Sequence, residues 1–286
     1  EIPIQYHKEG LDKIVTEKLK LKTKPLNLSR WQEIVHALKN AQDEVHVGVI
    51  GKYVSLSDSY KSLYEALAHG GIAHKIKVKI HKFDPEDYDM GQLESMDGIL
   101  IPGGFGSRGM EGKIKAIQYA RKSNKPLLGL CLGMQLMVIE FAKNVLGLKE
   151  ADSQEFVANT PHPVISMMEK QKEALGLGGT MRLGAYEAVL NPKSKLFTIY
   201  GKKEKISERH RHRFEFNNAY QEEMEKKGLI IGAVCEEGGL VEAIELPNHP
   251  WAIGVQYHPE YKSKPYLPHS LFGDFIKTCL AQKQKK

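Results

Sequence analysis

Cysteine is scarce in this chain of 286 residues, and the three cysteines lie far apart in the sequence. Cys131, Cys235 and Cys279 are odd in number, which argues against a disulfide framework and indicates a reducing compartment, the cytoplasm. Clusters of cysteine and histidine with the spacing of a zinc site are also lacking. The sequence therefore predicts neither a disulfide-stabilised secreted domain nor a metal site.

Long hydrophobic runs are absent as well, since no apolar stretch reaches the roughly 18–20 residues of a membrane helix. The amino end, EIPIQYHKEG, is too polar for a secretory leader. Because it starts with Glu1, we expect the chain to be an excised part of a longer protein. The net charge of +6 is diffuse or lies in tails such as 283–286, without a basic patch interleaved with aromatics. We expect no membrane and no nucleic acid as partner.

The pattern of the chain changes near residue 45. In residues 1–44 apolar side chains recur at helical spacing in two stretches, and Ser29 is the expected N-cap of the second. From residue 45 onward, short apolar runs alternate with amphipathic stretches, which predicts an α/β domain with a mostly parallel central sheet flanked by helices. We expect residues 1–44 to be a linker and 45–286 to be one domain, with a small antiparallel portion added by the later strands.

The expected strands bring chemistry to one edge of this sheet, because catalytic groups gather beyond the carboxyl ends of parallel strands. The strands are expected at 45–50, 76–80, 97–104, 125–130, 228–237, 240–246 and 251–260. The helices are expected at 57–71, 111–124, 132–145 and 269–281.

The stretch GLCLGMQ (129–135) places Cys131 between a strand and a helix, with a glycine two residues away on each side. This is the form of a nucleophile elbow. The amino end of the following helix favours the thiolate over the thiol, and the N–H of Leu132 points toward an oxyanion forming on a substrate. A buried structural cysteine fits the same five residues, so they alone leave both interpretations open.

A base for such a cysteine is offered by YHPE (257–260). His258 and Glu260 are two residues apart, so in an extended segment they face the same side, and Glu260 can hold the imidazole in one tautomer. The preceding apolar strand places the pair at the same sheet edge as Cys131. A His-Pro-Glu surface turn is the alternative, and the combination with the cysteine turn favours catalysis.

The stretch PGGFGSRG (102–109) also follows a strand, and its glycines allow backbone N–H groups to approach a ligand closely. Gly103 or Gly104 is a candidate second donor to an oxyanion. A phosphate-binding turn and a plain turn are the alternatives, since a glycine run by itself is weak evidence.

Two other motifs are less informative. GVIGKY (48–53) resembles a phosphate-binding loop only superficially, because the glycines are too close and Tyr53 follows the lysine in place of serine or threonine. ERHRHRFEFNN (208–218) in a strand would put three arginines on one face and two histidines on the other. A metal or RNA site, an arginine that grips a substrate carboxylate, and a solvated strand face all remain open for this segment.

Together, GLCLGMQ, PGGFG and HPE resemble the class I (triad) glutamine amidotransferases. GKYVSLSDSYKSLYEALAHGG, GGTMRLG and ERHRHRFEFNN are similar to the glutaminase domain of CTP synthase. The resemblance covers nearly the whole chain, and LDKIVTEKLKL and RWQEIVHAL resemble the segment that joins the synthase domain of that family to its glutaminase domain. It implies a flavodoxin-like fold.

The resemblance also implies roles for individual residues. Cys131 would be the nucleophile, His258 the general base and acid, and Glu260 the residue that orients the imidazole. Gly103 and the N–H of Leu132 would form the oxyanion hole. The implied glutamine-binding residues are Gly104, Leu132, Gly133, Met134, Gln135, Glu155 and Arg213. Glu155 suits the ammonium of the substrate and Arg213 its carboxylate.

The family implies partners that this chain lacks. An amino-terminal synthase domain of the same polypeptide would bind ATP, UTP and Mg²⁺, and the intact enzyme would be a homotetramer. GTP would act as an allosteric activator near a lid that includes GGTMRLG (178–184). We expect this chain, without a cofactor of its own, to release ammonia from L-glutamine but not to make CTP. A different triad amidotransferase, a γ-glutamyl hydrolase and an inactive regulatory module are the alternatives.

Overall fold

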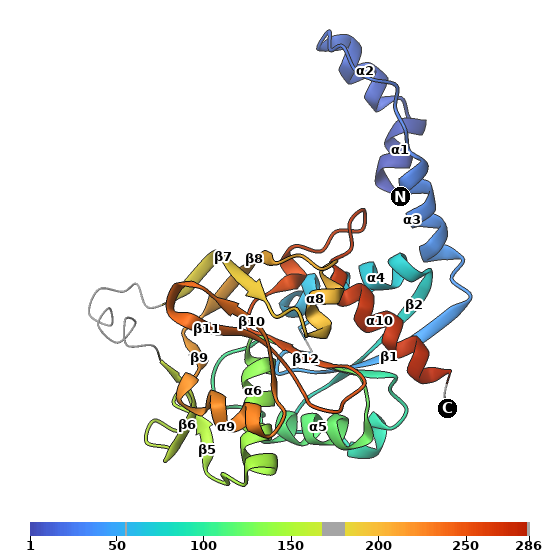
Figure 1. The fold of residues 1–286 in the computed structure, drawn as a ribbon. Helices are drawn as coiled ribbons and strands as arrows, with labels where there is room; N and C mark the ends of the chain where they lie inside the picture. Colours follow the sequence, from blue (N-terminus) through green and yellow to red (C-terminus); the bar gives the residue numbers. More distant parts are fainter. Residues whose placement is uncertain (55, 168–180, 285–286) are drawn as a thin grey trace.

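The computed structural model describes residues 1–54, 56–167 and 181–284 (Figure 1). Residues 178–180, the first part of the expected GTP-responsive lid, lie outside the described residues. The described chain is built on a nine-stranded sheet in the order β2-β1-β3-β4-β12-β11-β10-β7-β8, with helices on both faces. The α/β class expected from the sequence is confirmed.

One half of this sheet is parallel. Its strands are β2 (Ile76–Phe83), β1 (Asp43–Ile50), β3 (Gly98–Ile101), β4 (Leu127–Leu130) and β12 (Ala252–Val255). All residues of β3, β4 and β12 are buried, as expected for central strands covered on both faces. The carboxyl ends of these three strands therefore meet at one edge of the sheet.

The other half of the sheet is antiparallel. Its strands are β11 (Leu240–Glu245), β10 (Ile230–Cys235), β7 (Arg182–Leu190) and β8 (Lys205–His212). A separate three-stranded sheet consists of β5 (Ala151–Ser153), β6 (His162–Met167) and β9 (Phe214–Phe216). In the small sheet β5 and β6 pair in parallel, and β6 and β9 pair antiparallel, so the antiparallel portion that the sequence predicts consists mainly of β11, β10, β7 and β8.

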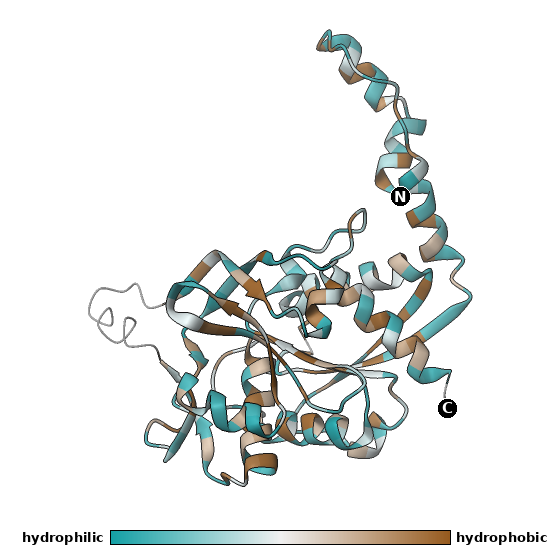
Figure 2. Cartoon of the chain, in the orientation of Figure 1, coloured by the Kyte–Doolittle hydropathy of each residue, from teal (hydrophilic) through white to brown (hydrophobic). Residues whose placement is uncertain are grey.

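Two buried cores lie on opposite faces of the main sheet. One packs against α5 (Met110–Ser123) and α6 (Leu132–Phe141), and the other packs against α4 (Lys61–His74) and α10 (Ser270–Lys283). The short helices α8 (Lys195–Ile199) and α9 (Gln221–Lys226) complete the domain. Every residue of α6 is buried, because the helix lies between the main and the small sheet, and Figure 2 shows hydrophobic residues along it and along the central strands.

The amino-terminal helices project from the domain as an arm (Figure 1). The arm consists of α1 (Ile2–Lys8), α2 (Leu11–Lys18) and α3 (Ser29–Lys39). Neither α1 nor α2 has a buried residue, whereas α3 buries Ile34 and Ala37 against Ile72. Several large apolar side chains of the arm are exposed to solvent: Ile2, Tyr6, Leu11, Ile14, Val15, Leu19, Leu21, Leu26 and Leu38.

The expected N-cap of α3 is wrong by one residue. Ser29 is already the first residue of α3, and its N–H donates a hydrogen bond of 2.9 Å to Oδ1 of Asn27. The N-cap residue is Leu28, which offers no capping side chain, and the Asn27 side chain bonds the N–H of the first helical residue instead. Among the described residues, no helix is long and apolar enough to cross a membrane.

Candidate active site

Cys131 occupies a strained turn between β4 and α6. Its φ of 51° and ψ of −103° lie outside the usual regions for a residue with a side chain, and its N–H donates to the carbonyl of Val255 on β12 at 2.7 Å. The glycine at 133 is required by packing, because a Cβ there would lie 2.1 Å from the carbonyl oxygen of Ile101. The strained turn expected from the sequence is present, with the cysteine at the amino end of a helix.

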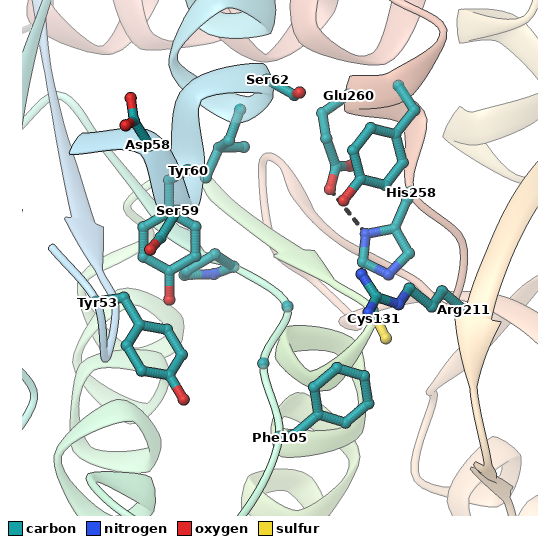
Figure 3. Close-up of a pocket in the computed structure, with 15 residues that line it drawn as sticks. Tyr53, Asp58, Ser59, Tyr60, Ser62, Phe105, Cys131, Arg211, His258 and Glu260 are labelled. Atoms are coloured by element: carbon teal, nitrogen blue, oxygen red, sulfur yellow. Dashed lines mark hydrogen bonds and ion pairs between the residues drawn. The ribbon is translucent and has the colours of Figure 1, made fainter. Parts of the chain in front are cut away.

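His258 lies beside Cys131 at the end of the neighbouring strand β12. Its Nδ1 donates to Oε1 of Glu260 at 2.7 Å, and its backbone N–H donates to the carbonyl of Arg209 at 2.8 Å. Figure 3 shows the imidazole between the carboxylate and the sulfur. The sequence predicted this pairing from the two-residue spacing and the position after the strand, but the expected extended segment is instead a short 3₁₀ helix, Pro259–Tyr261.

The protonation of His258 depends on both neighbours. Burial by itself would lower the pKa of His258, but its contact with the Cys131 sulfur and its hydrogen bond to the Glu260 carboxylate outweigh burial and raise the pKa to about 11. The imidazolium is therefore favoured while the sulfur carries negative charge. Such an ion pair is the form in which a cysteine acts as a nucleophile.

The glycine loop, residues 102–109 after β3, lies against both of these side chains. A Cβ at Gly103 would lie 2.9 Å from Cε1 of His258 and 3.5 Å from Cβ of Cys131. Only a residue without a side chain fits there unchanged, so the backbone of Gly103 lies against the side chains of His258 and Cys131. This placement is compatible with the oxyanion role that the resemblance implies for Gly103.

Cys131 lies where two pockets meet. The larger pocket, of about 370 Å³, is lined by Cys131, His258 and Glu260, and the smaller pocket, of about 110 Å³, is lined by Cys131, Glu155 and Arg213. Gly104 and Phe105 line both pockets. The smaller pocket thus offers one acidic and one basic side chain beside the cysteine, which matches the two charges of an α-amino acid.

Of the remaining residues predicted to bind the substrate, two line a pocket and two do not. Leu132 and Gln135 line the smaller pocket, and the Gln135 side chain donates to the carbonyl of Phe214 at 2.9 Å. Gly133 and Met134 line neither of the two pockets, because Gly133 packs against β3 and Met134 is fully buried in the core.

Gln256 near the sulfur was missed from the sequence, and Arg211 was indicated only as one of three arginines on a strand face. Gln256 is fully buried, and its Nε2 lies 3.7 Å from Sγ of Cys131. Its position two residues before His258 was a usable signal, because the same alternation argument that paired His258 with Glu260 applies to it. Arg211 lines the larger pocket, with its guanidinium 5.9 Å from the ring centroid of Phe105.

The segment 208–218 alternates as expected, with exposed arginines and buried histidines along β8. Burial, together with the nearby charge of Arg182, lowers the pKa of His210 to about 2 and that of His212 to about 3. The two rings, 2.9 Å apart between Nδ1 and Nε2, form a closed buried ring of polar contacts with Arg182, Glu215 and Glu242. In the described part of the chain, no group of three or more His, Cys, Asp or Glu residues is arranged to hold a metal ion.

Comparison with known proteins identifies the family of the chain. The family model "Glutamine amidotransferase class-I" matches residues 55–278. CTP synthases of Aquifex aeolicus and Carboxydothermus hydrogenoformans are 51% and 52% identical to the chain, of which they cover 100% and 98%. The chain spans only about half of these relatives, 54% and 53% of their lengths.

A solved structure of the Trypanosoma brucei CTPS glutaminase domain with bound acivicin is also similar. It superimposes with a TM-score of 0.78 and 36% identity over 83% of this chain and 94% of that chain. From the family match and this likeness, we conclude that the chain belongs to the class I glutamine amidotransferase family.

Proposed function

We propose that this chain is the glutaminase part of a CTP synthase, which hydrolyses L-glutamine to glutamate and ammonia. The observation that carries the proposal is the position of Cys131 beside His258, at the junction with a pocket that holds Glu155 and Arg213. The α-ammonium and α-carboxylate of glutamine would bind these two charged side chains. The side-chain amide would then lie at the sulfur.

In the first half of the reaction, the thiolate of Cys131 attacks the side-chain amide carbon of glutamine. The N–H groups of Gly103 and Leu132 stabilise the resulting oxyanion. His258 donates its proton to the departing nitrogen, so the carbon–nitrogen bond breaks, ammonia leaves and a γ-glutamyl thioester remains. Glu260 keeps the imidazole oriented through its hydrogen bond to Nδ1.

In the second half, a water molecule enters the position that ammonia has left. His258 takes a proton from this water, and the hydroxide attacks the thioester carbon. The carbon–sulfur bond of the second tetrahedral intermediate then breaks, which releases glutamate and restores the thiolate beside the imidazolium. We propose that in the longer protein the ammonia passes to a synthase domain, where it aminates UTP that ATP has phosphorylated on its 4-oxygen.

The amino-terminal arm would be the connection to that domain. Within the described chain, no surface covers its exposed apolar side chains, which is expected of a linker that packs against another domain. This exposure supports the expected boundary between residues 1–44 and 45–286. ATP, UTP and Mg²⁺ would bind the synthase domain, and GTP would act as an activator. The three buried free cysteines fit a reducing cytoplasm, and we propose a homotetramer for the whole enzyme.

A diazoketone analogue of glutamine tests the assignment of the nucleophile. We expect it to label the wild-type chain once, at Cys131, and not to label the Cys131→Ala variant. Cys235→Ala is the matched control, because burial raises the pKa of the Cys235 thiol and keeps it unreactive. Labelling that persists in Cys131→Ala refutes the assignment. Acivicin, which the Trypanosoma brucei domain holds, is a second probe of the same site.

The longer protein tests the proposed use of the ammonia. We expect Cys131→Ala to abolish CTP formation with glutamine as the nitrogen source and to leave CTP formation from added ammonium salts intact. Loss of both activities, or of neither, contradicts the division of labour proposed for the two domains.

A further inference from the structure

The motif GVIGKY (48–53), which lacks the spacing of a phosphate-binding loop, makes a specific contact with the active site. Lys52 follows β1, and its side chain is 9% exposed. Its Nζ donates to the carbonyl oxygen of Phe105 in the glycine loop at 2.6 Å. In the other direction, Nη2 of Arg108 donates to the carbonyl oxygen of Lys52 at 2.6 Å. Two reciprocal hydrogen bonds therefore join Lys52 to the loop that carries Gly103.

The peptide group between Phe105 and Gly106 is held at both ends by opposite charges. Its carbonyl oxygen accepts from the ammonium of Lys52, and its N–H donates to Oε1 of Glu155 at 3.0 Å. A peptide group carries a dipole of about 3.5 D, with its negative end at the oxygen and its positive end at the N–H. The ammonium of Lys52 and the carboxylate of Glu155 therefore stabilise the peptide group in only one of its two orientations. In the reversed orientation, like charges would face each other.

Lys52 and Glu155 thus form a clamp on the Phe105–Gly106 peptide. The clamp is needed because the backbone of this segment can rotate easily. Gly106 has a φ of +74°, a conformation that glycine adopts as readily as its mirror image. Gly104 and Gly103 precede Phe105, so little in the local sequence resists a rotation of the loop. The backbone of Gly103 nevertheless has to remain against His258 and Cys131, where even a Cβ would not fit.

We infer that Lys52 is a positioning residue for the oxyanion hole. Its ammonium and the Glu155 carboxylate hold the Phe105–Gly106 peptide in the orientation that keeps the Gly103 N–H directed at the reacting carbonyl. The inference rests on the function proposed above. Because Glu155 also faces the pocket proposed for the substrate ammonium, the same carboxylate links recognition of the amino group to the geometry of the loop.

Two reagents separate the oxyanion hole from the nucleophile. The γ-aldehyde analogue of glutamate adds the Cys131 sulfur to its carbonyl carbon, and the tetrahedral adduct needs the oxyanion hole. Iodoacetamide alkylates the same sulfur by displacement of iodide, and this reaction forms no oxyanion. For Lys52→Met in this chain, we expect aldehyde affinity to fall by about 10- to 100-fold and the alkylation rate to stay within about twofold of the wild type.

Three variants control the experiment. Lys52→Arg keeps a charged donor and should recover most of the aldehyde affinity. Lys195→Met removes a lysine-to-carbonyl hydrogen bond of 2.8 Å that is made to His249, outside both pockets, and should leave both reactions unchanged. Arg108→Ala removes the reciprocal bond from a half-exposed side chain and should lower aldehyde affinity by about 3- to 10-fold, which provides a test even if Lys52→Met fails to fold.

The outcomes distinguish the clamp from the proposed function. If Lys52→Met or Arg108→Ala binds the aldehyde as tightly as the wild type, the positioning role of Lys52 is refuted. It is also refuted if either variant loses aldehyde affinity and alkylation rate to the same extent. A wild-type chain that neither hydrolyses glutamine nor binds the aldehyde refutes the proposed function itself.

Discussion

Replacement of Gly103 by alanine should disturb catalysis without unfolding the protein. The new Cβ would lie 2.9 Å from Cε1 of His258, whereas ordinary contacts begin at 3.4 Å. The imidazole or the loop must therefore move by about 0.5 Å. A misplacement of 1 Å in an active site costs up to about 100-fold in rate, so half of that shift corresponds to about tenfold, or ~1.4 kcal/mol of transition-state stabilisation.

The second-order rate constant for labelling by the diazoketone, measured beside kcat/KM for glutamine hydrolysis, tests this value. Because His258 borders the open larger pocket, the ring can move aside, and we expect the free energy of unfolding to change by no more than about 1 kcal/mol. Gly91→Ala is the matched control, since its Cβ would make only an ordinary contact of 3.5 Å, with Asp89. If Gly103→Ala retains kcat/KM within about twofold, the reasoning from this contact is refuted.

Three further predictions concern the fold, the buried polar ring and the substrate. Gly133→Ala should lower stability by about 1–3 kcal/mol, because its Cβ would overlap the Ile101 carbonyl, and an unchanged melting temperature would contradict this. Burial raises the pKa of the Glu215 carboxyl from 4.5 to about 8, although the charge of Arg182 opposes the shift. The protonated carboxyl therefore stabilises the fold fully below pH 4.5, and this stability is lost as the pH rises through about 8. As the pH rises through this range, the melting temperature of Glu215→Gln should therefore increase relative to that of the wild type. A constant difference between the two melting temperatures would show that Glu215 does not titrate there. Arg213→Ala should raise KM for glutamine by about 10- to 100-fold with a smaller change in kcat, and an unchanged KM would remove Arg213 from the binding site.

Much of the site could be predicted because its signals are local. The turn at Cys131 depends on glycines within a few residues and on the strand and helix at its two sides. The contact between His258 and Glu260 was predicted from alternation in an extended segment, but Pro259–Tyr261 form a short 3₁₀ helix, and the contact is made within that turn. The alternation of β8 likewise separated its exposed arginines from its buried histidines. Ser29 shows the limit of this reasoning, because two polar residues near one helix start compete for the same cap.

The contacts that the sequence did not indicate join residues across long separations. Lys52 and Glu155 are 103 positions apart, and both reach the Phe105–Gly106 peptide only because β1 and β3 are neighbours in the sheet and the loop after β3 reaches the segment after β5. The buried ring around His210 and His212 likewise joins side chains from β7, β8, β9 and β11. Alternation indicates which face of β8 is buried, but no periodic pattern indicates which side chains from other strands these residues contact.

The sequence by itself determined the α/β class, the order of the central strands and helices along the chain, and the position of a cysteine and a histidine at strand ends. These properties depend on hydrophobic periodicity and on turn residues, which act over a few positions. Only the tertiary structure decided which strands are neighbours, and therefore which charges lie behind the glycine loop and which line the pocket beside Cys131. Strand pairing decides these contacts because it joins distant segments, and the energy of each contact depends on the burial that the whole fold creates.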